Sequence, residues 1–243
     1  MFHMPESRFV AFAVHLFLSV FIFTCLTIFI YFILLPGFLF YSEGGITFLT
    51  IIGSVDVVLG PLITLIIYKK VKPSIKLDLT IIALLQIAAL IYGLHALWSV
   101  RPIAVFYTGD SYHVVYQSTF KEPTYSDISK IPELNRLKPT ITGISTPAGN
   151  LKVDALVFTY IIQTGKSYFS QPELYKKYQD MIPNLINEGL SIEDAISKKI
   201  IKQDSKLAKL DRNRYRVFRF VGSLNSGYLL IDITTGKFIE TII

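Results

Sequence analysis

The chain has a single cysteine, Cys25, so no disulfide can form within it. It has only four histidines. The sequence also lacks the Gly-x-Ser-x-Gly, His-Glu-x-x-His, phosphate-loop and dinucleotide-binding patterns that place nucleophiles, zinc ions and nucleotides. We therefore predict no catalytic residue, no cofactor and no metal site, and we expect the protein not to be an enzyme.

Charged residues are scarce in the first part of the chain. The basic residues before position 99 are Arg8, Lys69, Lys70, Lys72 and Lys76, and the other 19 of the 24 are spread over the rest. We find no dense basic tract interleaved with aromatic residues, which is the usual signature of a nucleic-acid interface. Nucleic acid is therefore not an expected partner.

Apolar residues dominate the same part of the chain. Hydrophobic residues make up 51% of the sequence and its mean hydropathy is +0.48. Apolar runs cover residues 9–35, 46–68 and 77–98, and each is long enough to cross the roughly 30 Å of a bilayer core at about 1.5 Å per residue. We expect a membrane protein: a bundle of three transmembrane helices in residues 1–98, followed by a globular domain in residues 99–243.

The loop between the second and third runs carries four lysines, whereas the connector between the first and second has no lysine or arginine. Loops rich in lysine and arginine stay in the cytoplasm. Arg8 places the N-terminus on the same side, so three crossings leave residues 99–243 outside the cytoplasm. In a bacterium this predicts a multi-pass protein of the inner membrane with a periplasmic domain, in contact with the lipid bilayer.

The second apolar run carries Asp56 near its midpoint, followed one turn later by Gly60 and Pro61. A carboxylate at this depth is costly unless it has a partner. Pro61 has no N–H, which in an α-helix frees the carbonyl of Val57. Counted from the cytoplasmic ends of their helices, Asp56 and Gln86 differ in depth by roughly 5 Å, so their side chains could meet.

Two interpretations of these residues remain open. In the first, Asp56 is satisfied inside the protein and only fixes helix packing against Gln86. In the second, Asp56, Gly60, Pro61 and Gln86 form a docking point for a transmembrane helix of another protein. A proton relay is disfavoured because it needs a chain of ionisable groups. The histidines of the apolar runs, His15 and His95, are expected to be packing or interfacial residues.

Residues 99–243 alternate short β-branched and aromatic runs with turn signals. Residues 103–107 and 112–116 flank a Gly-Asp turn, which predicts a hairpin. Residues 215–221, 228–233 and 237–243 predict a three-stranded antiparallel meander.

Capping patterns at residues 170–173 and 191–194 predict helices over 174–181 and 195–207. Residues 127–137 suit a short helix, and residues 151–163 suit either a buried helix or a strand. The whole predicts a small α+β domain with antiparallel strands, its sheet covered by helices on one side. Its tyrosines form either a recognition face or part of the core; among them are Tyr107, Tyr112, Tyr116, Tyr160, Tyr168, Tyr175, Tyr178, Tyr215 and Tyr228.

Several stretches of the membrane part share a pattern with a known family. They are Val55-Asp56-Val57-Val58-Leu59-Gly60-Pro61-Leu62-Ile63-Thr64-Leu65, Tyr68-Lys69-Lys70, Asp78-Leu79, Ala83-Leu84-Leu85-Gln86-Ile87-Ala88-Ala89-Leu90-Ile91-Tyr92-Gly93 and Arg101-Pro102. In these the chain resembles the type IV pilin accessory proteins, the TfpX/TfpZ-type inner-membrane group. Beyond position 102 the resemblance is weaker and rests mainly on the late hairpin at residues 230–237.

The resemblance implies a non-enzymatic inner-membrane chaperone that helps its cognate major pilin enter the pilus. The type IV pilin, and the inner-membrane pilus assembly machinery, are then the expected partners. A pilin helix carries an acidic residue near its N-terminus and a free amine, and each needs a polar partner in the bilayer. Two alternatives are a pilin-modifying membrane enzyme and an extracytoplasmic scaffold or sensor protein. Loss of piliation on deletion, with the pilin mass unchanged, separates the chaperone from the modifying enzyme.

Overall fold

The computed structural model describes residues 5–71, 73–116, 137–144 and 174–242. The chain divides into two compact units. Unit 1 comprises Met1–Ile33 and Gly44–Val100, and unit 2 comprises Leu34–Glu43 and Arg101–Ile243. The segment predicted as a helix over 127–137, apart from its last residue, and the segment predicted as a helix or strand over 151–163 lie outside the described residues.

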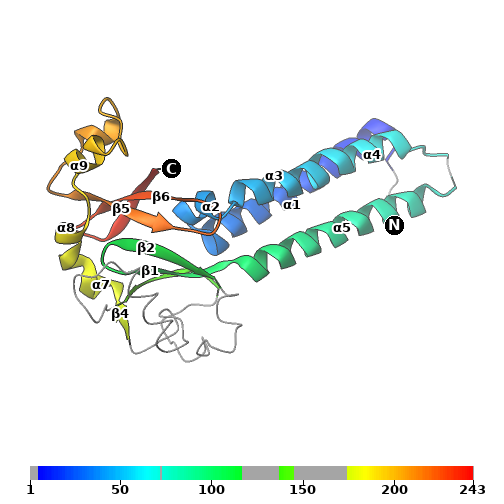
Figure 1. Cartoon of the computed structure of the whole chain (residues 1–243). Coiled ribbons are helices and arrows are strands. Elements are labelled where there is room, and N and C mark those ends of the chain that lie inside the picture. The colour runs from blue at the N-terminus through cyan, green and yellow to red at the C-terminus, as the bar shows by residue number, and fades with distance from the viewer. Residues whose placement is uncertain (1–4, 72, 117–136, 145–173, 243) are drawn as a thin grey trace. The chain divides into compact units, whose positions relative to one another are not determined.

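Unit 1 contains three helices that are long and apolar enough to cross a membrane (Figure 1). The first consists of α1 (Arg8–Phe29), continued by the π-helical turn η1 (Ile30–Leu34), whose last residue begins unit 2. The second consists of α3 (Gly45–Gly53), the π-helical turn η2 (Ser54–Leu59) and α4 (Gly60–Ile67). The third is α5 (Ile75–Val100). Each of the three helices begins and ends within two residues of its predicted bounds.

The three helices pack unevenly. α1 lies along α4 and η2, whereas α5 packs against α4 and α3. Near the start of α1, buried Ala11 packs with Tyr68 and Ile75. The Tyr68 hydroxyl donates a hydrogen bond to the carbonyl of Pro5 at 2.6 Å. This end of the bundle is therefore closed by side chains from all three helices.

The connector between the first two apolar helices is not the simple loop that the sequence suggested. It forms a short helix, α2 (Phe38–Ser42), which belongs to unit 2. Phe38 packs on Phe220 and Phe238, with ring centroids 5.4 and 5.1 Å apart. The expected division placed this segment with the membrane part, but these contacts make it part of the core of unit 2.

Glu43 fixes the end of this connector in unit 2. This residue is only 6% exposed, and its carboxylate is fully paired. It accepts hydrogen bonds from the hydroxyls of Ser42 (3.0 Å), Tyr116 (2.7 Å) and Ser223 (2.9 Å). Tyr116 in turn accepts the backbone N–H of Ser223 at 2.6 Å. A buried carboxylate with three donors is well compensated, so it holds the connector against the sheet.

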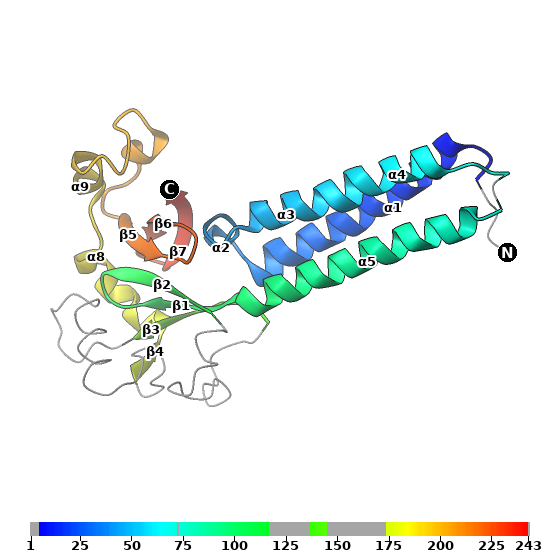
Figure 2. The same cartoon turned by 45° about the vertical axis from the view of Figure 1, so that its right-hand side comes forward.

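The core of unit 2 is a seven-stranded mixed sheet in the order β4-β3-β1-β2-β5-β6-β7 (Figure 2). Its strands are β1 (Pro102–Tyr107), β2 (Ser111–Tyr116), β3 (Thr140–Ile144), β4 (Tyr175–Lys177), β5 (Tyr215–Val221), β6 (Ser226–Asp232) and β7 (Lys237–Ile242). The predicted hairpin (β1, β2) and meander (β5, β6, β7) are confirmed. The predicted antiparallel strands are therefore present, but the sheet as a whole is mixed, because β1 pairs with β3 and β2 with β5 in parallel.

Described elements cover both faces of this sheet. On one face, Val217 and Leu230 pack with Ala195 of α9 (Ile192–Ser197) and with Ile201. The other face carries two buried rings: Phe218 packs on Tyr112, and Phe220 packs on Phe38 of α2. The expectation of helices on one side only is therefore wrong.

Two predicted helices are largely replaced by other structure. Residues 174–181 contain β4 followed by the single turn α7 (Tyr178–Met181), because Tyr175–Lys177 pairs with β3 instead of continuing a helix. Ser191 caps α9 as predicted, accepting the N–H of Asp194 at 3.0 Å. That helix ends at Ser197, and Lys199 adopts a φ of 59°. The 3₁₀ turn η8 (Lys206–Lys209) follows; the turns η7 (Ile182–Asn184) and α8 (Leu185–Glu188) precede α9.

Three of the tyrosines are core residues. Tyr107 and Tyr112 are fully buried and Tyr178 is nearly so. Tyr112 and Tyr178 share a hydrogen bond of 2.8 Å between their hydroxyls, and Tyr107 donates to Glu188. Burial raises the pKa of Tyr178 to about 12. For these three residues the core interpretation holds rather than the recognition face.

Acid sensitivity of unit 2 is expected to depend on Asp232. This buried carboxylate accepts hydrogen bonds from Arg214 at 2.8 and 3.1 Å and from the Thr234 hydroxyl at 2.6 Å. These donors hold the pKa of Asp232 well below its usual range. A carboxyl group with a lowered pKa stabilises the fold above its unfolded pKa of about 3.9, and this contribution is lost as the pH falls through the native pKa.

Asp232→Asn should therefore lower the melting temperature at pH 7, and the gap to the native protein should shrink below about pH 4. Thermal unfolding of the full chain in detergent from pH 7 to pH 3 checks this. Asp204→Asn, at an exposed aspartate, is the control. A gap that does not change with pH would contradict the role of Asp232.

Candidate functional site

The second apolar helix contains a widened turn next to Pro61. Within η2 the N–H of Gly60 donates to the carbonyl of Val55, five residues earlier, instead of four. The next bond of this π-type series would join residue 61 to the carbonyl of Asp56, and Pro61 has no N–H to form it. The carbonyl freed by Pro61 in this geometry is therefore that of Asp56, not that of Val57 as an α-helical register predicted.

Gln86 of α5 binds this carbonyl. Its side-chain Nε2 donates to the backbone oxygen of Asp56 at 3.4 Å, and its Oε1 lies 2.9 Å from Nε2 of His15 in α1. The other ring nitrogen of His15 lies 2.6 Å from the hydroxyl of Thr64 in α4. One chain of hydrogen bonds thus joins all three apolar helices.

The proton positions in this chain follow from the carbonyl at its end. A backbone carbonyl can only accept, so the amide NH₂ of Gln86 faces Asp56 and its oxygen faces His15. Nε2 of His15 therefore carries a proton. When His15 is neutral, Nδ1 accepts from the Thr64 hydroxyl. When His15 is protonated, Nδ1 donates to that hydroxyl, which then donates to the carbonyl of Gly60 at 3.1 Å. Both states leave every group paired.

The Asp56 side chain does not meet Gln86 as the sequence suggested. Its Oδ1 is buried and has no hydrogen-bond partner among the described residues. Burying a carboxylate oxygen without a donor is unfavourable, particularly in a low-dielectric surrounding. Asp56 is thus a side chain that can gain a polar contact from a bound group.

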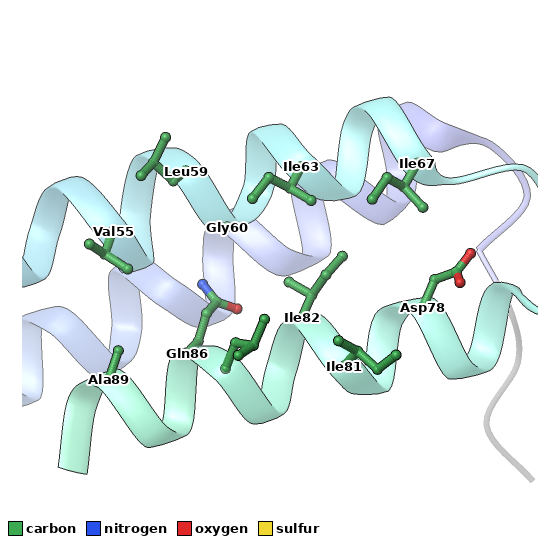
Figure 3. A pocket seen from close by; sticks show the side chains of 11 residues that line it. Val55, Leu59, Gly60, Ile63, Ile67, Asp78, Ile81, Ile82, Gln86 and Ala89 are labelled. Carbon is green, nitrogen blue, oxygen red and sulfur yellow. The ribbon is translucent and has the colours of Figure 1, made fainter. Parts of the chain in front are cut away.

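Gly60 is required for the position of Gln86. A Cβ built on Gly60 would lie 1.9 Å from Nε2 and 2.7 Å from Cδ of Gln86. Figure 3 shows Gln86 reaching from α5 toward Gly60 on the facing helix. Only glycine leaves room for the amide there, so Gly60 and Pro61 act together: Pro61 frees the carbonyl of Asp56 and Gly60 admits the amide that binds it.

Two apolar grooves run beside this contact between the second and third helices. One, of about 630 Å³, lies between α4 and α5 (Figure 3). It is lined by Val55, Leu59, Gly60, Ile63, Ile67, Asp78, Ile81, Ile82, Leu85, Gln86 and Ala89. The other, of about 310 Å³, is lined mainly by residues of α3 and α5 and includes Asp56. Val55 and Ala89 line both, so the grooves form a single seam.

The structure thus brings Asp56, Gly60, Pro61 and Gln86 together, with the Asp56 backbone rather than its side chain at the centre. Two members, His15 and Thr64, were missed by the sequence analysis, which gave His15 only a packing or interfacial role. The depth of His15 in its helix was a signal that the sequence did contain. Counting about 1.5 Å per residue from Arg8 places His15 about 10 Å into its helix, between the depths of Thr64 and Gln86.

The chain is similar to the fimbrial assembly protein of serogroups C1 and C2 of Dichelobacter nodosus. The two are 30% identical over 105 residues, a match that covers 42% of this chain and 79% of the relative. No family model matches the chain, and no solved structure matches it.

Proposed function

Because the chain belongs to the same family as the Dichelobacter nodosus fimbrial assembly protein, we propose that it is an accessory protein for the assembly of type IV pili. In this proposal it acts as a chaperone without enzymatic activity. It binds the transmembrane helix of its cognate major pilin in unit 1 and the pilin headgroup with unit 2, before the pilin enters the pilus. The inner-membrane assembly machinery is a second partner.

The observation that carries the proposal is the seam beside Gln86. Its lining on the second helix runs from Phe48 to Ile67, which corresponds to about 28 Å of helix. This nearly equals the roughly 30 Å of a bilayer core. An apolar groove of this length matches a transmembrane helix, and small residues such as Gly60 and Ala89 allow such a helix to approach closely.

Asp56 gives the seam a polar anchor. Its Oδ1, which has no hydrogen-bond partner in the part of the chain that the structure describes, can accept a hydrogen bond from a donor on the incoming helix, such as the free amine of a pilin. The hydrogen bonds of Gln86 hold the backbone around Asp56 in place. The anchor is therefore in position before the partner binds, so less ordering entropy is lost on binding.

Photocross-linking along α5 tests this docking. A photoreactive residue in place of Leu85, which lines the seam, should capture the pilin helix, whereas one in place of neighbouring Leu84 should not, although both side chains are exposed (66% and 60%). Capture at position 85 should fall in an Asp56→Ala variant without a fall in protein level. Equal capture at both positions, or capture of this protein's own helices alone, would overturn the proposal.

We also propose that the protein spans the bacterial inner membrane with its N-terminus in the cytoplasm and unit 2 in the periplasm. The lysine-rich loop after α4 supports this orientation. In a variant with Cys25 replaced by serine, a cysteine in place of Leu224 should react with a membrane-impermeant maleimide in intact spheroplasts. A cysteine in place of Val71, which is 94% exposed, should react only after permeabilisation. Labelling of position 71 but not of position 224 in intact spheroplasts would show the opposite orientation.

A further inference from the structure

The net charge of the protein is concentrated in one segment. Residues 198–219 contain nine of the 24 lysine and arginine residues and two of the 18 aspartate and glutamate residues. This segment therefore carries a net charge of +7, whereas the remainder of the chain carries −1 and the whole carries +6. The sequence analysis treated the basic residues as spread out, and this count corrects it.

Most of these charges are exposed and uncompensated. Among the described residues, Arg212 pairs with Glu193 and Arg214 with Asp232. The other exposed cations make no ion pair with any described residue; they are Lys198, Lys199, Lys202, Lys206, Lys209 and Arg219. We call these six side chains the basic surface. Unpaired charges of one sign gathered in one segment attract the opposite charge, so the surface favours an acidic partner.

The topology of unit 2 places the basic surface at one end of its sheet. The chain passes into unit 1 at Glu43 and Arg101, and these lie by Tyr116 and Ser223, at one end. The β1–β2 turn lies at the opposite end. Ser111, just after that turn, pairs with Arg219 in the parallel strand β5.

β5 therefore begins at the end of the sheet that is far from the two passages. The segment before it, α9 and η8, lies there too (Figures 1 and 2). About 26 Å of extended chain separates Tyr215 from Ser223. The basic surface therefore lies at the end of unit 2 that is far from both passages.

The composition of the segment disfavours single-stranded nucleic acid. Its two aromatic side chains are Phe218, which is buried, and Tyr215, which is half-buried against the core, whereas such binding relies on bases stacking on exposed aromatic rings. We infer that the basic surface is the binding face for a carboxylate-rich patch on the headgroup of the pilin. This inference rests on the proposed function and adds to it the surface and the charge that unit 2 uses.

Carbodiimide cross-linking tests the inference, because this reagent joins a lysine amine directly to a carboxylate that it touches. The full chain is used in membranes that contain the pilin, with identification of the linked peptides by mass spectrometry. Lysines of the basic surface should link to acidic residues of the pilin headgroup, and the yield should fall as salt is added, since exposed charge pairs are screened.

A matched pair of variants shows whether position matters rather than net charge. K202E/K206E/K209E reverses three charges of the basic surface and should lower the yield about tenfold, since each attraction becomes a repulsion. K176E/K177E/K237E reverses three equally exposed lysines on the edge strands β4 and β7 and should leave the yield unchanged. An equal loss in both variants would overturn the inference.

The remaining outcomes separate this inference from the proposed function. Capture of the pilin at position 85 without any link to the basic surface overturns the inference alone. Links to the basic surface without capture at position 85 support the inference and overturn helix docking. If the pilin is neither captured at position 85 nor linked to the basic surface, the inference and helix docking are both overturned. Protection of these lysines in phosphatidylglycerol vesicles, compared with phosphatidylcholine vesicles and without pilin, would assign the surface to lipid and overturn the inference.

Discussion

Replacing Gly60 with alanine is expected to displace Gln86 and, under the proposed function, to reduce pilin binding and surface piliation about tenfold. The added Cβ would lie 1.9 Å from the Gln86 amide, and the amide is the free end of a flexible side chain, so it would rotate away. The carbonyl of Asp56 and the N–H of His15 would then each lose a partner. Hydrogen bonds between membrane helices contribute about 0.6 to 2 kcal/mol each, and 1.4 kcal/mol is a factor of ten.

Two comparisons identify the cause of this effect. Ile66→Ala is the control on the same helix, because this side chain is 76% exposed and lines neither groove, and it should leave piliation unchanged. If Gly60→Ala acts through Gln86, then Gln86→Ala should have a similar effect and the double variant should be no worse. Fully additive losses, measured as pilus yield at equal protein level, would show that Gly60 acts elsewhere.

Replacing Glu43 with alanine is expected to destabilise unit 2 by about 3 kcal/mol. Hydrogen bonds to a charged group contribute about 1.5–3 kcal/mol each and are not additive. The change would leave the hydroxyls of Ser42, Tyr116 and Ser223 without their acceptor. The connector should then detach from the sheet and become sensitive to protease. Thermal unfolding in detergent and limited proteolysis between residues 34 and 43 measure both effects.

The control for this change is Glu193→Ala. Glu193 also forms an ion pair, with Arg212, but its side chain is 50% exposed, and exposed pairs contribute about 0–1 kcal/mol. We expect little loss of stability and no new protease site between residues 34 and 43. Similar behaviour of the two variants would show that burial of Glu43 does not fix the connector.

Features of unit 1 and unit 2 that depend on neighbouring residues were predictable from the sequence. The apolar helices were found because crossing a bilayer sets their length and composition. The hairpin at Gly109 and the meander were found because turn residues and alternating patterns are local signals. Ser191 was identified as a cap for the same reason, since its hydroxyl binds an N–H three residues later.

Features that depend on distant partners were missed. Nothing within residues 140–144 shows that they pair with β1 in parallel, because a parallel partner can lie anywhere along the chain. Tyr175–Lys177 follows a capping pattern, yet pairing with β3 outweighs a helical preference of a few tenths of a kcal/mol per residue.

The candidate site shows the same division. Asp56 and Pro61 stood out because each is costly in a membrane helix. The sequence could not show that the backbone widens at η2, and this shift by one residue moves the freed carbonyl from Val57 to Asp56. His15 was undervalued because a single histidine on a helix carries no sign of its partners, which lie on the other two helices.

The place of α2 in unit 2 has a consequence for how the protein is made and handled. The contacts of Phe38 and Glu43 with β5, β7 and the turn after β5 join this segment to strands that are translated about 180 to 200 residues later. Unit 2 therefore cannot complete its core until β7 has been synthesised. A recombinant fragment limited to residues 101–243 would leave Phe220 and Phe238 without Phe38. Soluble versions should carry residues 34–43 joined to Arg101 by a short linker, in place of the helices between.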